Sequence, residues 1–141
     1  MAESDVAGLK VAESQPPKPQ GNWALYEIQH ISWDGRTLTI RMDDKDRQVT
    51  ICFDLPASFR SQDEGDMLAY WSARSDEKVP IATVYTIERS SYLDWFKRSG
   101  VTALRADLQQ WLIAGMNQCV EVICEAGEVP SIVTEKMSSE Q

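Results

Sequence analysis

The sequence predicts an α+β fold, a single domain formed mainly by an antiparallel sheet with helices packed on it. The first observation is a β-rich run at 81–87, which is followed by a capped amphipathic segment and two further apolar runs. The second is Asp34-Gly35, a strong hairpin signal between two segments of largely apolar and alternating character. We expect six strands, at about 23–33, 36–43, 48–54, 81–88, 109–116 and 119–125.

The first three strands are expected to form an antiparallel meander. Asp34-Gly35 would provide a two-residue type I′ loop between 23–33 and 36–43. In the second strand Leu38, Ile40 and Met42 alternate with polar residues, as on a sheet with one buried face. The polar turn Asp43-Asp44-Lys45-Asp46-Arg47 then leads to 48–54, and we expect its acidic side chains to be solvated.

One helix is expected at 91–99. Ser91 can cap its first turn, and Tyr92, Trp95 and Phe96 recur at the spacing of a single helix face. We therefore expect the Trp95 side chain to be buried against the sheet. Gly100 is expected to end the helix.

Two segments fit both helix and strand. Met67, Leu68 and Trp71 favour a helix at 64–74, although alternate residues from Met67 to Ala73 also fit a strand. Helix propensity favours a helix at 103–114. We nevertheless expect a strand at 109–116, because 119–125 would otherwise lack a hairpin partner, and Asn117-Gln118 is the expected loop.

The length of 141 residues suits one domain with a sizeable core, which we place at 22–131. Residues 1–21 are expected to be a disordered, proline-containing tail. The reason is that Gln15-Pro16-Pro17-Lys18-Pro19 propagates neither a helix nor a strand ladder. The polar segment 132–141 is expected to fray.

The net charge of −8 limits the class of partner. Such a charge repels phosphates, so direct nucleic-acid binding is not expected, whereas a basic protein is a suitable partner. No apolar run approaches the roughly 18–20 residues that span a bilayer, and the first residues show no export signal. We expect a cytoplasmic protein that does not bind a membrane.

The chain has three cysteines, Cys52, Cys119 and Cys124, and one histidine, His30. The odd cysteine count and the spacing predict neither a disulfide framework nor a zinc site. Ser-His and Cys-His catalysis lack the residues they need, and neighbouring acids in polar turns are usually solvated. We expect no metal and no enzymatic activity.

Several stretches occur in a characteristic order. They are Phe59-Arg60, Asp63-Glu64-Gly65-Asp66, Ser90-Ser91-Tyr92-Leu93-Asp94-Trp95-Phe96, Leu108-Gln109-Gln110-Trp111-Leu112-Ile113, and Cys119-Val120-Glu121-Val122-Ile123 before Pro130. Over roughly 59–131 the chain resembles small bacterial immunity proteins, which are encoded beside toxins of contact-dependent or type VI secretion systems. Members often carry His-Tyr where this chain has Gln110-Trp111, so a role of that histidine does not carry over.

The resemblance implies a small α+β protein that binds and blocks a cognate toxin, without catalysis or cofactor. An acidic surface would suit the basic cleft of a nuclease toxin by taking the place of phosphates. The candidate toxin-binding residues, chosen for charge density and loop position, are Asp43, Asp44, Asp46, Asp63, Glu64 and Asp66. Two other functions stay open: a secretion-associated adaptor or chaperone that binds cargo through a sheet edge and the proline-rich tail, and a carboxylate-dependent hydrolase. The sequence predicts neither the identity of the toxin nor the oligomeric state.

Overall fold

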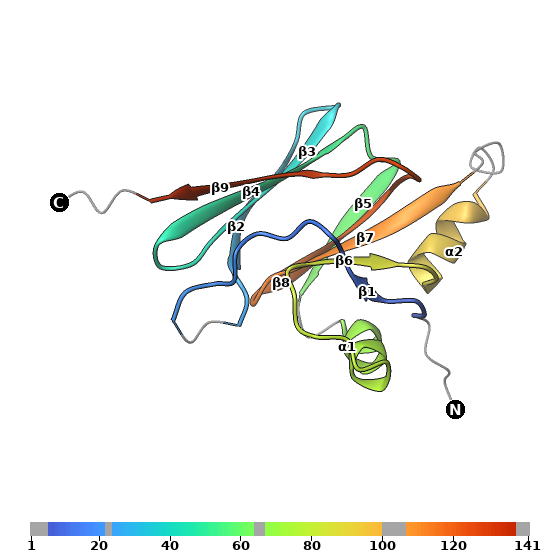
Figure 1. Ribbon diagram of the computed structural model, residues 1–141. Helices are drawn as coiled ribbons and strands as arrows, with labels where there is room; N and C mark the ends of the chain where they lie inside the picture. The colour runs from blue at the N-terminus through green and yellow to red at the C-terminus, as the bar shows by residue number, and fades with distance from the viewer. Residues whose placement is uncertain (1–5, 22–23, 64–66, 100–106, 138–141) are drawn as a thin grey trace.

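The computed structural model describes residues 6–21, 24–63, 67–99 and 107–137. It confirms the α+β class, with strands in two antiparallel sheets and two helices among these residues (Figure 1). The helices are α1 (Leu68–Asp76) and α2 (Ser91–Lys97). The strands are β1 (Lys10–Val11), β2 (Glu27–Trp33), β3 (Thr37–Asp43), β4 (Arg47–Asp54), β5 (Ser58–Asp63), β6 (Val84–Ile87), β7 (Leu108–Ala114), β8 (Gln118–Glu125) and β9 (Ser131–Lys136).

The two sheets pack face to face. One has the order β2-β3-β4-β9 and the other β1-β6-β7-β8-β5. Alternate residues of the meander, such as Leu38, Ile40 and Ile51, point into the space between the sheets and are fully buried there. Trp111 and Val122 fill the same cluster from β7 and β8. The expected antiparallel meander is therefore confirmed, although its first strand, expected at 23–33, begins at Glu27 among the described residues, and its apolar face forms half of the main core.

The five-stranded sheet is covered on its other face as well. There Tyr70 of α1 and Met67, the N-cap of that helix, belong to a second apolar cluster, which also contains Leu112 and Cys119 of the sheet. Helix α2 packs beside a third cluster that contains Tyr92, Leu93 and Ile123. Because β7 and β8 are buried on both faces, most of their residues are apolar and do not alternate with exposed polar ones; Gln110 and Glu121 are buried polar exceptions.

The tip of the β7–β8 hairpin joins the two sheets. Asn117 Oδ1 accepts from the Ile28 amide at 3.0 Å, and Asn117 Nδ2 donates to the Ile28 carbonyl at 2.9 Å. Met116 N also donates to Tyr26 O at 2.9 Å. The register of β2 shifts between Ile28 and His30, so the Asn117 side chain bonds the backbone next to this bulge.

Both predicted hairpins exist, but each loop lies one residue away from its predicted position. Trp33 pairs with Leu38, which makes Gly35-Arg36 the loop instead of Asp34-Gly35. The Asp34 carboxylate accepts from the amides of Arg36 and Thr37, and Gly35 has a φ of 94°. Likewise Gly115 N donates to Gln118 O, so the second loop is Met116-Asn117.

The expected tails are wrong where the structure describes them. Residues 10–11 form β1 and pair with β6, while Val6 and Leu9 are buried in the second cluster. The segment reaches the core before its prolines begin, and its apolar residues cover sheet surface that would otherwise be exposed. At the other end, 131–136 form β9, which pairs with β4, so the ordered domain extends beyond residue 131.

The two ambiguous segments follow the preferred prediction. Residues 68–76 are helical as α1, and 108–114 are a strand that pairs with both β6 and β8. The expected strand at 81–88 starts later, at Val84, because the preceding loop bonds to the Tyr85 hydroxyl instead of a neighbouring strand. In α2 the N-cap is Ser90, whose Oγ accepts from Leu93 N at 3.0 Å, and Ser91 is exposed. The helix ends at Lys97, and Gly100 lies outside the described residues.

Candidate functional site

The predicted acidic turn between β3 and β4 contains one carboxylate that holds the turn together. Asp44 is only 3% exposed, contrary to the expectation that it is solvated. Its Oδ1 accepts from the amides of Asp46 and Arg47, both at 2.8 Å, and its Oδ2 accepts from Gln20 N at 2.8 Å. Burial opposes its ionisation, but these amides and the Arg47 guanidinium hold the pKa of Asp44 below its usual value.

Asp43 and Asp46 flank this buried carboxylate and keep exposed surface. Asp43 is half-buried at the end of β3, where its Oδ1 accepts from Gln29 Nε2 at 3.1 Å. The same Gln29 amide donates to Glu27 Oε1 at 3.3 Å, because β2 pairs Glu27 with Asp43. Asp46 is exposed. The strand register thus adds Glu27, which the sequence did not single out, to the acidic group.

The second predicted acidic segment lies at the same end of the sandwich. Asp63, exposed at the end of β5, pairs with Gln118 of β8. Gln118 follows Asn117, whose side chain bonds to Ile28, the residue after Glu27. We call Glu27, Asp43, Asp46 and Asp63 the acidic end. Glu64 and Asp66 lie outside the described residues.

Basic side chains occur on one side of the acidic end. Lys45 is exposed within the β3–β4 turn, and Lys136 of β9 pairs with Arg47. Lys136 lies on the edge strand β9, whereas Glu27 and Asp63 lie on β2 and β5. Lys45 and Asp46 are neighbours in the turn, and Asp46 O accepts from Met137 N just after β9, so basic residues accompany the acidic end near β9.

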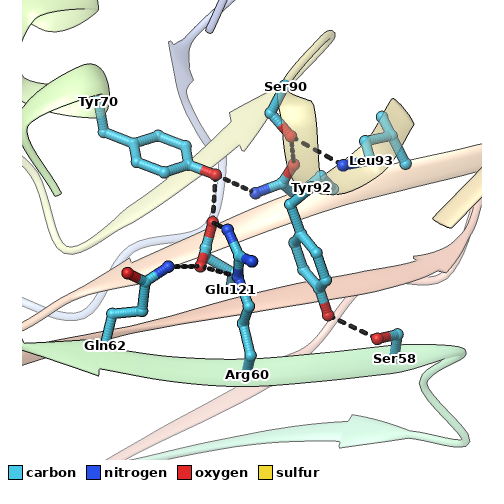
Figure 2. Close-up of polar contacts among 9 residues, drawn as sticks. Ser58, Arg60, Gln62, Tyr70, Ser90, Tyr92, Leu93 and Glu121 are labelled. Carbon is cyan, nitrogen blue, oxygen red and sulfur yellow. Dashed lines mark hydrogen bonds and ion pairs between the residues drawn. The ribbon is translucent and has the colours of Figure 1, made fainter. Parts of the chain in front are cut away.

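A buried polar network occupies the outer face of the five-stranded sheet (Figure 2). At its centre Glu121 of β8 is 0% exposed. Arg60 of β5 donates to it twice, from Nε to Oε1 at 2.6 Å and from Nη2 to Oε2 at 3.2 Å. Gln62 Nε2 donates to Oε1 at 2.9 Å, and the Tyr70 hydroxyl of α1 donates to Oε2. These four hydrogen bonds match the roughly four acceptor positions of a carboxylate.

The network continues from Tyr70 to the start of α2. Gln110 Nε2 donates to the Tyr70 hydroxyl at 2.7 Å, and Gln110 Oε1 accepts from the Ser90 hydroxyl. Ser90 in turn accepts from Leu93 N. Each hydrogen bond in this series, from the Leu93 amide to the Tyr70 hydroxyl, therefore donates in the direction of Glu121. Hydrogen bonds that share a direction in this way polarise one another favourably.

The electrostatics of the network favour a fixed protonation pattern. Burial first, and then the adjacent Glu121 carboxylate, raise the pKa of Tyr70 well above its usual value. Tyr70 therefore remains a donor at neutral pH. Since Tyr70, Arg60 and Gln62 already occupy the Glu121 oxygens, we interpret the network as a structural link between β5, β8 and α1.

The sequence residues with metal-binding chemistry do not converge in the part of the chain that the structure describes. There, no group of three or more His, Cys, Asp or Glu side chains is placed to hold a metal ion. Cys119 and Cys124 are buried and Cys52 is partly buried, and no disulfide joins any of these three described cysteines. Among the described residues, neither helix is long and apolar enough to cross a membrane.

Comparisons with protein-family models, curated proteins and solved structures found no match for this chain.

Proposed function

We propose that this protein binds and neutralises a basic protein toxin through its acidic end, without catalysing a reaction. The observation that carries the proposal is the strand register, which places Glu27 opposite Asp43 beside the turn that contains Asp46, with Asp63 at the same end of the sandwich. The net charge of −8 adds a long-range attraction for a basic partner. The resemblance over 59–131 supplies the class of partner, a cognate bacterial toxin such as a nuclease.

The Asp44 contacts make the acidic end suitable for binding. Its buried carboxylate fixes the β3–β4 turn to the backbone of Gln20, so Asp43 and Asp46 are presented from an ordered loop. A surface that is ordered before binding loses less conformational entropy when the partner docks. Asp44 is therefore a positioning residue in this proposal, and the contact residues are its neighbours.

The other two functions receive less support. The proline-rich segment expected to capture cargo for an adaptor is instead docked along the domain, with Tyr26 donating to Pro17 O at 2.6 Å. A hydrolase needs a carboxylate free to exchange a proton. The most buried carboxylate, Glu121, has its oxygens occupied by Arg60, Gln62 and Tyr70.

Charge reversal tests the proposal. The variant Glu27→Lys/Asp43→Lys/Asp46→Lys should bind the protein encoded by the neighbouring gene at least tenfold more slowly at low salt, because steering of a basic partner is lost. The on-rate should also become less sensitive to salt. A matched control with the same charge change, Asp107→Lys/Glu125→Lys/Glu128→Lys, reverses exposed acids elsewhere on the domain. This control variant should retain most of the wild-type association rate.

Binding kinetics at two salt concentrations and a growth-protection assay in cells that express the neighbouring protein provide the readouts. Circular dichroism should show that both triple variants are folded, since none of the substituted residues belongs to the core. The proposal is wrong if the neighbouring protein does not bind. It is also wrong if the two triple variants slow binding equally, because total charge would then account for the effect.

A further inference from the structure

A groove of about 790 Å³ lies between the N-terminal segment and the loop that precedes β6. One wall comes from residues 9–21 and the other from 78–83. Most of its lining is apolar, including Leu9, Val11, Pro16, Pro80 and Ile81. Val11 is 37% exposed and Ile81 54% exposed, so two large aliphatic side chains lie open to solvent in the lining of the same groove.

Both walls are fixed by hydrogen bonds to the body of the domain. The Gln15 side chain accepts from the amides of Thr83 and Val84 and donates to Ala12 O at 3.1 Å. This bonding fixes the first wall to the start of β6. On the second wall, the Tyr85 hydroxyl donates to Pro80 O at 3.1 Å and accepts from Ala82 N at 2.7 Å. Hydrogen bonds within the domain therefore hold both walls in place, as in the largely pre-formed sites that bind small molecules.

The backbone of the groove is poorly suited to an extended peptide. Strand addition requires free backbone donors and acceptors along one edge. Here the amides of Ala82, Thr83 and Val84 already donate to side chains. The four prolines of the lining have no N–H group to offer; they are Pro16, Pro17, Pro19 and Pro80.

The charge of the lining contrasts with that of the whole chain. Lys10, Lys18 and Lys78 line the groove, and they are half of the six lysines in the sequence. No acidic residue is among the described residues that line it, although the chain has 22 acidic residues and 14 Lys and Arg residues. An anionic group is thus attracted to the edge of an apolar groove in an otherwise acidic protein.

We propose that this groove binds a small amphipathic anion, a molecule with an apolar body and one carboxylate, sulfonate or phosphate group. The apolar body would contact the proline and aliphatic walls, and the anionic group would interact with the three lysines. The volume falls within the roughly 300–1,000 Å³ typical of small-molecule sites. This activity is separate from the proposed toxin binding, which uses acidic residues.

The test uses dodecanoate as the probe, below its micelle concentration, with binding followed by titration calorimetry and by displacement of the fluorescent sulfonate 1-anilinonaphthalene-8-sulfonate. The variant Lys10→Gln/Lys18→Gln/Lys78→Gln should bind dodecanoate at least tenfold more weakly, since all three charge contacts to the anionic group are removed. The control Lys45→Gln/Lys97→Gln/Lys136→Gln replaces the other three lysines and alters the net charge by the same amount. It should bind within about twofold of the wild type.

Two further measurements separate charge from apolar contact. Dodecanol, which has the same chain and no charge, should bind the wild type more weakly than dodecanoate and should not distinguish the two triple variants. Ile81→Gln should weaken both ligands, and because Ile81 is more than half exposed the variant should still fold. The proposal is overturned if the wild type does not bind dodecanoate, if both lysine triples weaken binding equally, or if an acidic peptide binds and dodecanoate does not.

Discussion

The Asn117 side chain bonds both backbone groups of Ile28 and so connects the tip of one sheet to the edge strand of the other. Asn117 is exposed, yet the two atoms it satisfies lie at a bulge where β2 loses its regular pairing with β3. A side-chain amide suits this position because it carries an acceptor oxygen for the Ile28 N–H and a donor NH2 group for the Ile28 carbonyl.

We predict that Asn117→Asp destabilises the domain more than Asn117→Ala at neutral pH. Alanine removes two hydrogen bonds, at a cost of roughly 1–3 kcal/mol. Aspartate retains the acceptor but places a negative oxygen beside the Ile28 carbonyl, so folding would favour its protonated form. The loss of folding stability caused by Asn117→Asp should therefore decrease as the pH falls below about 5.

Urea unfolding of the two Asn117 variants at pH 7 and pH 4.5 provides the measurement. Met116→Ala is the matched control, because it changes an exposed neighbour whose contact with Tyr26 is made by the backbone. If Asn117→Asp is as stable as the wild type at pH 7, the side chain does not bond Ile28 as described.

A second prediction concerns Tyr70 in the network around Glu121. Tyr70→Phe removes the donor to Glu121 and the acceptor for Gln110, and should lower the free energy of unfolding by about 1–3 kcal/mol. The folded state raises the pKa of Tyr70, mainly through burial, so it favours the protonated phenol. Stability should therefore decrease as the pH rises above about 10, where tyrosines of the unfolded chain ionise.

The measurement is the free energy of unfolding between pH 8 and pH 11. The Tyr70→Phe variant should lose less stability over this interval than the wild type. Tyr85→Phe is a useful comparison, because burial also raises the pKa of Tyr85 but no carboxylate accepts from its hydroxyl. An unchanged alkaline dependence in Tyr70→Phe would contradict the buried network.

Much of the fold could be predicted because local patterns and tertiary contacts agree. In β3 the alternation of Leu38, Ile40 and Met42 matches the observed burial at each position. A strand at 109–116 was predicted against helix propensity, and the observed strand at 108–114 pairs on both sides as a central strand must. Each hairpin loop was predicted only to within one residue. In the β2–β3 hairpin, Asp34 precedes the two-residue loop and accepts from the amides of Arg36 and Thr37, instead of being a loop residue itself.

The N-terminal segment shows where sequence reasoning fails. Its prolines predict that the segment forms neither a helix nor regular strand pairing. They do not prevent an irregular segment from packing on the domain through hydrogen bonds that involve side chains. Gln15 and Pro17 are held by Val84 and Tyr26, partners that are distant in the sequence. No local pattern encodes those contacts.

The acidic candidates show the same limitation. Charge density singled out Asp43, Asp44 and Asp46 together, yet three amide donors make Asp44 a buried structural residue. Glu121 offered a usable signal, since one acid stands among the apolar residues of 119–124 and a buried charge needs partners. Its partners Arg60 and Tyr70 come from other elements and could not be identified in advance.

The third prediction follows from the position of Asp44. Asp44→Ala leaves three amides without their acceptor and should cost on the order of 3 kcal/mol, given about 1.5–3 kcal/mol for a hydrogen bond to a charged group. The folded state lowers the pKa of Asp44 despite its burial. Its contribution is therefore present above the unfolded pKa near 4 and is lost as the pH falls through the lower folded value.

Comparing Asp44→Asn with the wild type by chemical unfolding from pH 7 to pH 2.5 isolates this contribution. The difference in stability between the two proteins should shrink below about pH 4. Asp46→Asn, an exposed neighbour in the same turn, should differ little from the wild type across this range. A constant difference at all pH values would mean that the charge of Asp44 does not contribute.

The last prediction reverses the ranking that the helix pattern of α2 suggests. Trp95 was expected to be buried with Tyr92, but its side chain is 58% exposed and stacks on Tyr92 from the solvent side, with ring centroids 6.3 Å apart. Tyr92 is the buried member: its hydroxyl lies 2.6 Å from Ser58 Oγ, and the Arg60 guanidinium lies 4.1 Å from its ring centroid.

Tyr92→Ala should therefore cost about 3–5 kcal/mol, as large core truncations do, whereas Trp95→Ala should cost about 1 kcal/mol. Denaturant midpoints measure both values, and Tyr92→Phe, which loses only the hydroxyl contact, should fall near 1 kcal/mol. Equal losses for the two alanine variants would restore the pattern in which both aromatic rings pack against the sheet.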